Sequence, residues 1–90
     1  MKHYFPSLAG TVDLMNGDNY KTRMIAEYHQ TKIRYEALRD FCNRIEAAQW
    51  TGKEVPKHES PLGLLKDQQR IMEEYMHVLE IRAIVDGVEL

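Results

Sequence analysis

The sequence predicts an all-α protein, an antiparallel two-helix hairpin with a short N-terminal segment that oligomerises into a helical bundle. The run from Asn19 to Gln49 has no Pro and no Gly, and it repeats apolar or small residues in alternating steps of four and three. A second run, from Ser60 to Val85, carries the same spacing. Five Gly and three Pro are too few for an all-β fold built on many tight turns. The first seam comprises Met24, Tyr28, Thr31, Tyr35, Leu38, Cys42, Ile45 and Gln49.

Length and composition indicate one soluble domain over residues 1–90. The chain is 43% hydrophobic and 29% charged, and its net charge of −2 gives no overall field that attracts a DNA or RNA polymer. Cys42 is the only cysteine, so no intrachain disulfide forms, which fits a reducing compartment. We find no apolar signal-peptide core and no stretch of about 18 apolar residues, so we expect a cytoplasmic protein without membrane contact.

Residues 1–18 form the N-terminal segment, which contains enough apolar side chains to pack against the hairpin. Pro6 fits the first turn of a short helix, although Gly10 and the β-branched pair that follows it disfavour one. Asn16-Gly17-Asp18 indicates a turn. Asp18 is the expected N-cap of the long helix, because its carboxylate suits the positive helix N-terminus.

The two long helices are expected at residues 19–50 and 60–85. Trp50 closes the first, Gly52 serves as its C-terminal stop, and the polar stretch 51–59 is the connecting loop. Ser60 is the expected N-cap of the second helix, with Pro61 at its first helical position. Residues 86–90 form a short tail, extended or docked.

Each helix carries a second apolar line beside its seam. On the second helix the seam is Leu65, Gln69, Met72, Met76, Leu79 and Ala83, and the neighbouring line is Leu64, Gln68, Ile71, Tyr75, Val78, Arg82 and Val85. One partner helix covers only one of these lines, and a lone hairpin buries little surface. The double pattern therefore predicts a homo-oligomer, a dimer forming a four-helix bundle or a higher assembly.

Few residues in the sequence suggest a catalytic or metal-binding site. Glu74 and His77 form a Glu-x-x-His pair that would need to face a bundle core to hold a metal, but they lie opposite the apolar seam. Cys42 lies on the seam, where it is expected to act as a small buried hydrophobe rather than a nucleophile. No Gly-rich phosphate loop or Cys/His metal spacing occurs. We therefore expect no catalytic residues, no metal and no cofactor, and a protein that is not an enzyme.

The start of the long helix is the strongest candidate for ligand binding. Tyr20, Lys21 and Arg23 lie in its first turns, with Tyr28 and Lys32 further along. A helix N-terminus favours anions, a Tyr ring stacks on a nucleobase, and basic side chains neutralise phosphate. The simpler interpretation, a core Tyr flanked by solvated bases, explains the same residues without a ligand.

The chain resembles the small phage proteins that sequester cyclic nucleotide signals, the anti-CBASS sponges and the related hairpin of the anti-Thoeris sponges. Tyr4, then Leu14-Met15-Asn16, then Lys21 is similar to a Tyr, spacer, Leu-Met-Asn and Lys pattern in that family, with Asn16–Asn19 resembling an insertion. The stretches DNYKTRMIAEY and LLKDQQRIMEEYMHVLEIRA resemble the two hairpin helices. The resemblance implies that Tyr4 stacks on a base and Lys21 contacts phosphate.

The resemblance implies a phage-type protein that holds cyclic di- or trinucleotide second messengers between subunits without catalysis and so blocks host antiphage immune signalling. Tyr20 and Arg23 are additions to that site made from the residues alone. The alternative is a structural or adaptor hairpin that only self-associates or binds another coiled coil, which explains every apolar line and needs no ligand. A metal-dependent bundle enzyme is the third and least favoured reading.

Overall fold

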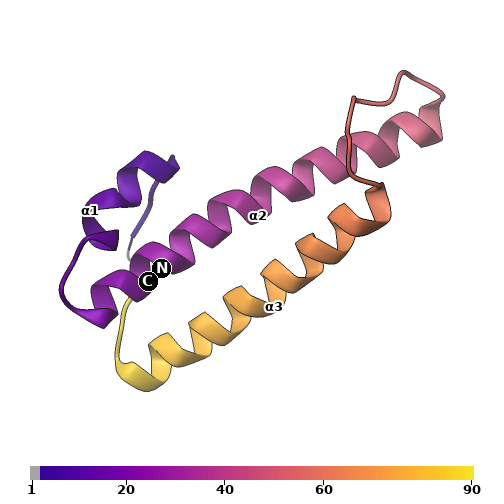
Figure 1. The fold of residues 1–90 in the computed structure, drawn as a ribbon. Helices are drawn as coiled ribbons and strands as arrows, with labels where there is room; N and C mark the ends of the chain where they lie inside the picture. Colours follow the sequence, from indigo (N-terminus) through magenta and orange to yellow (C-terminus); the bar gives the residue numbers. More distant parts are fainter. Residues whose placement is uncertain (1–2) are drawn as a thin grey trace.

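A computed structural model describes residues 3–90, and the two N-terminal residues of the predicted segment lie outside the described part. Within that range the elements are a 3₁₀ turn at Leu8–Thr11, α1 at Val12–Met15, α2 at Tyr20–Thr51 and α3 at Leu62–Asp86 (Figure 1). None of the residues from 3 to 90 belongs to a strand. The predicted all-α class is confirmed.

α2 is the middle layer of the molecule. It packs against α3 on one side and against the 3₁₀ turn and α1 on another, so the N-terminal segment and α3 lie on different faces of it (Figure 1). Its 32 residues rise about 48 Å, which sets the longest of the molecular dimensions of 49 × 24 × 21 Å. No helix between residues 3 and 90 has the length and apolar content needed to cross a membrane.

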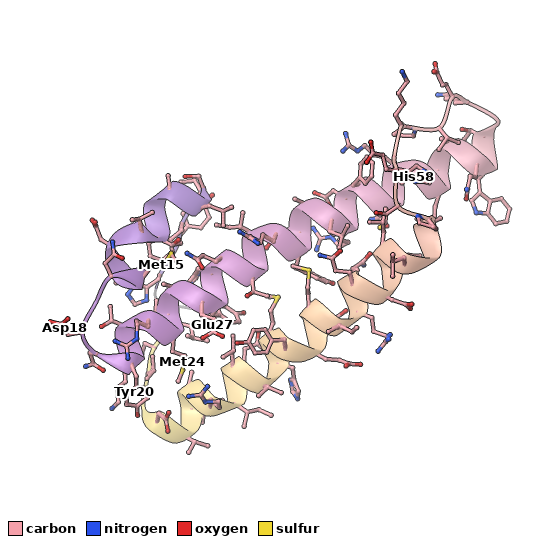
Figure 2. The ribbon with its side chains drawn as sticks, in the orientation of Figure 1. Met15, Asp18, Tyr20, Met24, Glu27 and His58 are labelled. Atoms are coloured by element: carbon pink, nitrogen blue, oxygen red, sulfur yellow. The ribbon has the colours of Figure 1, made fainter. Side chains whose placement is uncertain are left out.

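The start of α2 differs from the sequence prediction by one residue. Asn19, not Asp18, is the N-cap, because its backbone is extended and its side-chain oxygen accepts the Lys21 N–H at 2.9 Å. Asp18 is exposed on the outer side of the preceding turn (Figure 2). The helix ends at Thr51, one residue beyond the predicted end at Trp50, and Gly52 is its C-terminal stop as predicted, with φ of +71°.

α3 also begins one position later than predicted. Pro61 is the N-cap rather than the first helical residue, because its carbonyl accepts the N–H groups of both Leu64 and Leu65 at 3.1 Å. Gly87, at φ of +69°, ends the helix, and the Val88 N–H donates to the Ala83 carbonyl at 2.7 Å. This Schellman arrangement turns the tail back towards the hairpin.

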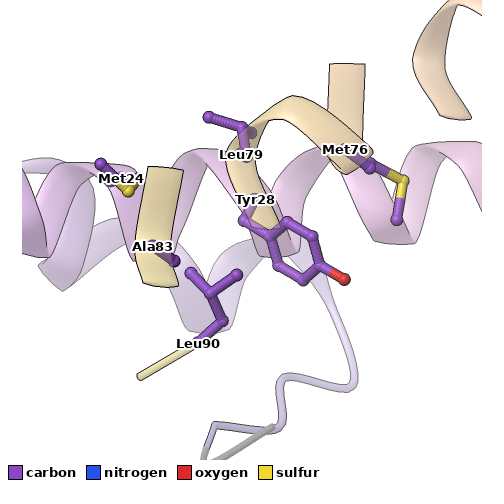
Figure 3. Close-up of a cluster of buried hydrophobic side chains, with 6 residues drawn as sticks. All are labelled: Met24, Tyr28, Met76, Leu79, Ala83 and Leu90. Atoms are coloured by element: carbon purple, nitrogen blue, oxygen red, sulfur yellow. The ribbon is translucent and has the colours of Figure 1, made fainter. Parts of the chain in front are cut away.

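The main apolar cluster lies towards the end of the hairpin where α2 begins and α3 ends, and Figure 3 shows its side chains. Its buried members are Met24, Tyr28, Met76, Leu79, Ala83 and Leu90. All but Leu90 lie on the two predicted seams, and Leu90 shows that the tail is docked. Tyr28 closes one side of the cluster, where its hydroxyl donates to Glu80 Oε2 at 2.6 Å. Burial, followed by this carboxylate, raises the pKa of Tyr28, so its phenol stays protonated and donating.

The half of the hairpin interface nearer the connecting loop has fewer buried side chains. Cys42, Ile45 and Ala48 are buried, while Gln49, the last predicted seam position, is exposed. An ion pair between Lys66 and Glu46 joins the two helices there. The connecting loop folds back along α2, since the His58 ring lies edge-on to Phe41 with centroids 6.4 Å apart (Figure 2).

The N-terminal segment is held on α2 by a small polar centre. Thr11 is fully buried, and its hydroxyl both donates to the Leu8 carbonyl at 2.7 Å and accepts from Gln30 at 2.9 Å. Before this turn, residues 3–5 run extended, and the His3 N–H donates to the Leu90 carbonyl at 2.9 Å. The two ends of the described chain therefore meet on the same face of α2.

Candidate functional site

The predicted residues at the start of α2 are accessible cations. Lys21 and Arg23 are exposed, and neither forms an ion pair with any residue between 3 and 90. The Arg23 guanidinium donates to the Gly17 carbonyl at 2.8 Å, which fixes it against the turn before the helix. Tyr20 is half-exposed beside them. Each base is therefore available to an anion.

These two cations do not converge within one protomer. Residues that are two positions apart on an α-helix differ by about 200° around its axis, so the side chains of Lys21 and Arg23 leave α2 on nearly opposite sides. This arrangement does not favour one phosphate held by both side chains. Any shared ligand at this end of the helix must bridge to another protomer or use only one of them.

Tyr4 lies further along α2, beside Lys32 rather than Lys21. The two lysines are eleven residues apart, or about 16 Å along the helix. Tyr4 borders a small cavity of about 150 Å³ between the extended N-terminal residues and α2. Its lining residues are Tyr4, Phe5, Pro6, His29, Lys32, Ile33 and Glu36. The structure therefore separates the Tyr4 and Lys21 that the resemblance pairs.

His29 forms the inner wall of this cavity. It is only 3% exposed, and its ring meets those of Phe5 and Tyr28 edge-on at centroid distances of 4.9 and 5.3 Å. Its Nε2 is buried without a hydrogen-bond partner. Burial lowers the pKa of His29, and the nearby His3 and Lys32 lower it further. The imidazole is therefore neutral at pH 7, with an unused polar nitrogen.

The charge at the cavity mouth comes from Lys32 and Glu36. Their side chains form an i, i+4 ion pair at 3.3 Å, and both are partly exposed. Such a pair contributes little stability, so its lysine can turn towards a phosphate at small cost. With Tyr4 81% exposed at the rim, the site offers a free aromatic face and a cation, with the buried imidazole of His29 in its inner wall. That combination suits a flat, polar, anionic ligand.

A larger open groove of about 740 Å³ runs along α3. Its lining includes Glu73, Glu74 and Glu80, and its one arginine, Arg70, already pairs with Glu74 at 3.2 Å. The excess of carboxylates repels a phosphate-bearing ligand. Glu74 and His77 are both exposed, and residues 3–90 contain no group of three or more side chains arranged to hold a metal ion.

Cys42 has no features of a nucleophile. It is 1% exposed, and burial raises the pKa of its thiol, which leaves little thiolate at neutral pH. It occupies the seam as a small hydrophobe, as the heptad-like spacing predicts.

Comparison with known families decides the class of protein. The Sequestin family model matches residues 18–84, which include all of α2, the loop and most of α3. The chain belongs to the Sequestin family. This is a phage-type sponge family, so this sequestin is a binding protein by family rather than a member of an enzyme family. No curated protein and no solved structure gives a significant match.

The matched range contains Lys21, His29 and Lys32, but it begins at residue 18 and so does not include Tyr4. The sequence prediction included Lys32 without placing Tyr4 beside it, and it gave neither His29 nor Phe5 a role in a binding site. One signal was present: Ala26, His29 and Ile33 recur in steps of three and four, off the seam. That spacing marks a second contact face of α2, which the N-terminal segment covers.

Proposed function

We propose that this sequestin binds and holds a cyclic di- or trinucleotide second messenger without transforming it. In a phage-infected cell, this removes the signal from the host effector in the cytoplasm and blocks antiphage immune signalling of the anti-CBASS type. Support comes from the family, whose members are sponges, and from the chemistry of the cavity beside Tyr4.

The observation that carries the proposal is the buried, unpartnered Nε2 of His29 behind an exposed aromatic ring and a lysine. A buried polar atom without a partner is costly, and a ligand that hydrogen-bonds to it recovers that cost. A nucleobase supplies both hydrogen-bonding edges and a face for Tyr4 to stack on, and its phosphate suits Lys32. We assign base stacking to Tyr4 and phosphate contact to Lys32.

Tyr20, Lys21 and Arg23 form a second set at the start of α2. Because they lie about 14–18 Å from Lys32 along the helix and point in different directions, we assign them to a ligand group presented by, or shared with, another protomer. A cyclic dinucleotide has two phosphates and two base faces, so a pair of symmetry-related sets matches it. We accordingly propose a homo-oligomer, in which the ligand contacts more than one copy.

The adaptor hairpin is the competing function, and one observation favours it. α3 keeps a line of exposed apolar side chains that implies a protein partner and requires no small ligand. The two functions differ in whether any nucleotide binds the native protein.

A thermal-shift screen against cyclic di- and trinucleotides and cyclic ADP-ribose isomers tests the proposal. A ligand that binds only the native state raises the melting temperature, by an amount that grows with its concentration above Kd. If none of these nucleotides stabilises the protein, the adaptor function replaces the sponge.

Substitutions then locate the ligand. Losing a charge-assisted contact costs about 1.5–3 kcal/mol, so Lys32→Ala should weaken binding about ten- to a hundredfold in titration calorimetry. Arg34→Ala is the matched control, because it removes an exposed base from the same helix outside the cavity. Lys21→Ala tests the second set, and His77→Ala tests the groove on α3. Loss of affinity in the His77 variant alone would place the ligand in that groove and overturn the assignment.

A further inference from the structure

α3 carries a second apolar line that α2 leaves uncovered. The helix is buried along Met76, Leu79 and Ala83, and the second line lies about 100° around the helix from that seam. The exposed line consists of Leu64, Ile71, Tyr75, Val78 and Val85, which are 60%, 54%, 41%, 51% and 78% exposed. Its members are spaced as a coiled-coil seam, with Gln68 and Arg82 at the two remaining positions. The line spans about 32 Å, nearly the whole helix.

We infer that a second copy of this chain covers the line, with the two α3 helices antiparallel and a two-fold axis near Tyr75. This inference rests on the proposed self-association and is independent of the ligand. A two-fold interface brings a surface against itself, so residues at equal distances from the axis meet. Leu64 lies eleven residues before Tyr75 and Val85 ten after it, while Ile71 lies four before and Val78 three after. The apolar residues of one copy therefore meet apolar residues of the other.

Charge decides between the two possible directions. Arg82 lies within the apolar line and forms no ion pair with any residue from 3 to 90. In a parallel pair it would face its own copy, and two like charges would meet in an apolar interface. In the antiparallel pair it lies against the turn of the other α3 that contains Asp67 and Gln68. In its own chain Asp67 forms one long ion pair, with Arg70 at 4.0 Å, and its side chain is 66% exposed, so its carboxylate can also meet this partner.

The uncovered line also favours a partner of the same length and pattern over an unrelated one. The line runs nearly the whole length of α3 and is self-complementary about its own centre, and it shares only Val78 with the lining of the groove that contains the glutamates. Joining two hairpins in this way buries a third apolar face and gives a four-helix bundle core with α3 at its centre. The cavity beside Tyr4 stays open, since it lies between the N-terminal segment and α2.

Single-cysteine cross-linking tests the direction. In a Cys42→Ala background, Tyr75→Cys should form a disulfide-linked dimer under mild oxidation, because only residues near the axis come within the 4.4–6.8 Å between Cα atoms that a disulfide allows. Val85→Cys alone should stay unlinked, whereas an equimolar mixture of the Leu64→Cys and Val85→Cys proteins should give the mixed dimer. A Val85→Cys homodimer without the mixed product would overturn the antiparallel arrangement.

Light scattering coupled to size exclusion tests the interface itself. The parent should elute as an oligomer, and Val78→Asp should shift it to a monomer of 10.6 kDa at micromolar concentration with unchanged helical circular dichroism. Ile84→Asp is the control, because Ile84 is 81% exposed but lies on another face of α3. A monomeric parent would overturn the interface, and the thermal-shift screen would then still report separately on ligand binding. An oligomer that survives Val78→Asp would place the interface elsewhere.

Discussion

Two tyrosine–glutamate hydrogen bonds join α2 to α3, and they should differ sharply in strength. The Tyr28 hydroxyl lies 2.6 Å from Glu80 Oε2 in a side chain that is 3% exposed, whereas Tyr35 lies 3.3 Å from Glu73 Oε2 near solvent. A hydrogen bond to a charged group contributes about 1.5–3 kcal/mol when shielded. Because Glu80 is itself only half-buried, we expect Tyr28→Phe to lower the free energy of unfolding by about 1.5 kcal/mol. The same change at Tyr35 should cost less than about 0.5 kcal/mol.

Urea unfolding at one fixed protein concentration measures both variants, since an oligomer's apparent stability depends on concentration. For a chain of this size, Tyr28→Phe should lower the melting temperature by roughly 6–12 °C. A double-mutant cycle with Glu80→Ala isolates the pair, and its coupling energy should be about 1 kcal/mol or more. Equal losses for Tyr28→Phe and Tyr35→Phe would refute the reasoning, because burial and distance would then not decide the strength of the bond.

Three further predictions concern the packing and the buried histidine. Gly17→Ala should destabilise the fold, because a Cβ there would lie 2.9 Å from the side chain of Thr22. Gly63→Ala is the control: a Cβ there meets nothing within 4 Å, so this change should be neutral or stabilising by up to about 1 kcal/mol. Because the pKa of His29 is lowered in the folded state, the unfolded chain binds more protons than the folded chain as the pH falls. The melting temperature should therefore fall as the pH drops below about 6.5, and His29→Phe should flatten that dependence. Leu79→Ala should cost about 2–5 kcal/mol in urea unfolding, because Leu79 is fully buried; a cost below 1 kcal/mol would contradict the packing.

The sequence predicted the hairpin because its seams are long and regular. Met24 and Tyr28 are buried in one cluster with Leu79 and Ala83, and Ile45 is buried further along the same seam, as the steps of four and three require. The helix starts were each wrong by one residue, since neighbouring residues compete for the same cap. Asn19 follows Asp18 and has equal capping ability, and only the backbone conformation decides between them.

The candidate site was less accessible to sequence reasoning. Tyr4 reaches Lys32 because the extended residues 3–5 and the docked tail share one face of α2, a contact between distant segments that no local spacing reveals. His29 looked like an ordinary polar residue beside the seam, and its burial depends on Phe5 covering it. Lys21 was placed correctly as an exposed base near a helix N-terminus, but its pairing with Tyr4 stays a prediction that requires a second protomer.

The central claim, that this sequestin holds a cyclic nucleotide and leaves it intact, is tested most directly by capture and release. Native protein is incubated with each cyclic di- or trinucleotide, separated from free ligand, denatured by heat, and the supernatant analysed by mass spectrometry and chromatography. We predict that one cyclic nucleotide is recovered unchanged in mass and retention time, in an amount that scales with the protein, and that protein denatured beforehand captures none. Recovery of a linearised or hydrolysed product would make the protein an enzyme, and recovery of no nucleotide would contradict the sponge.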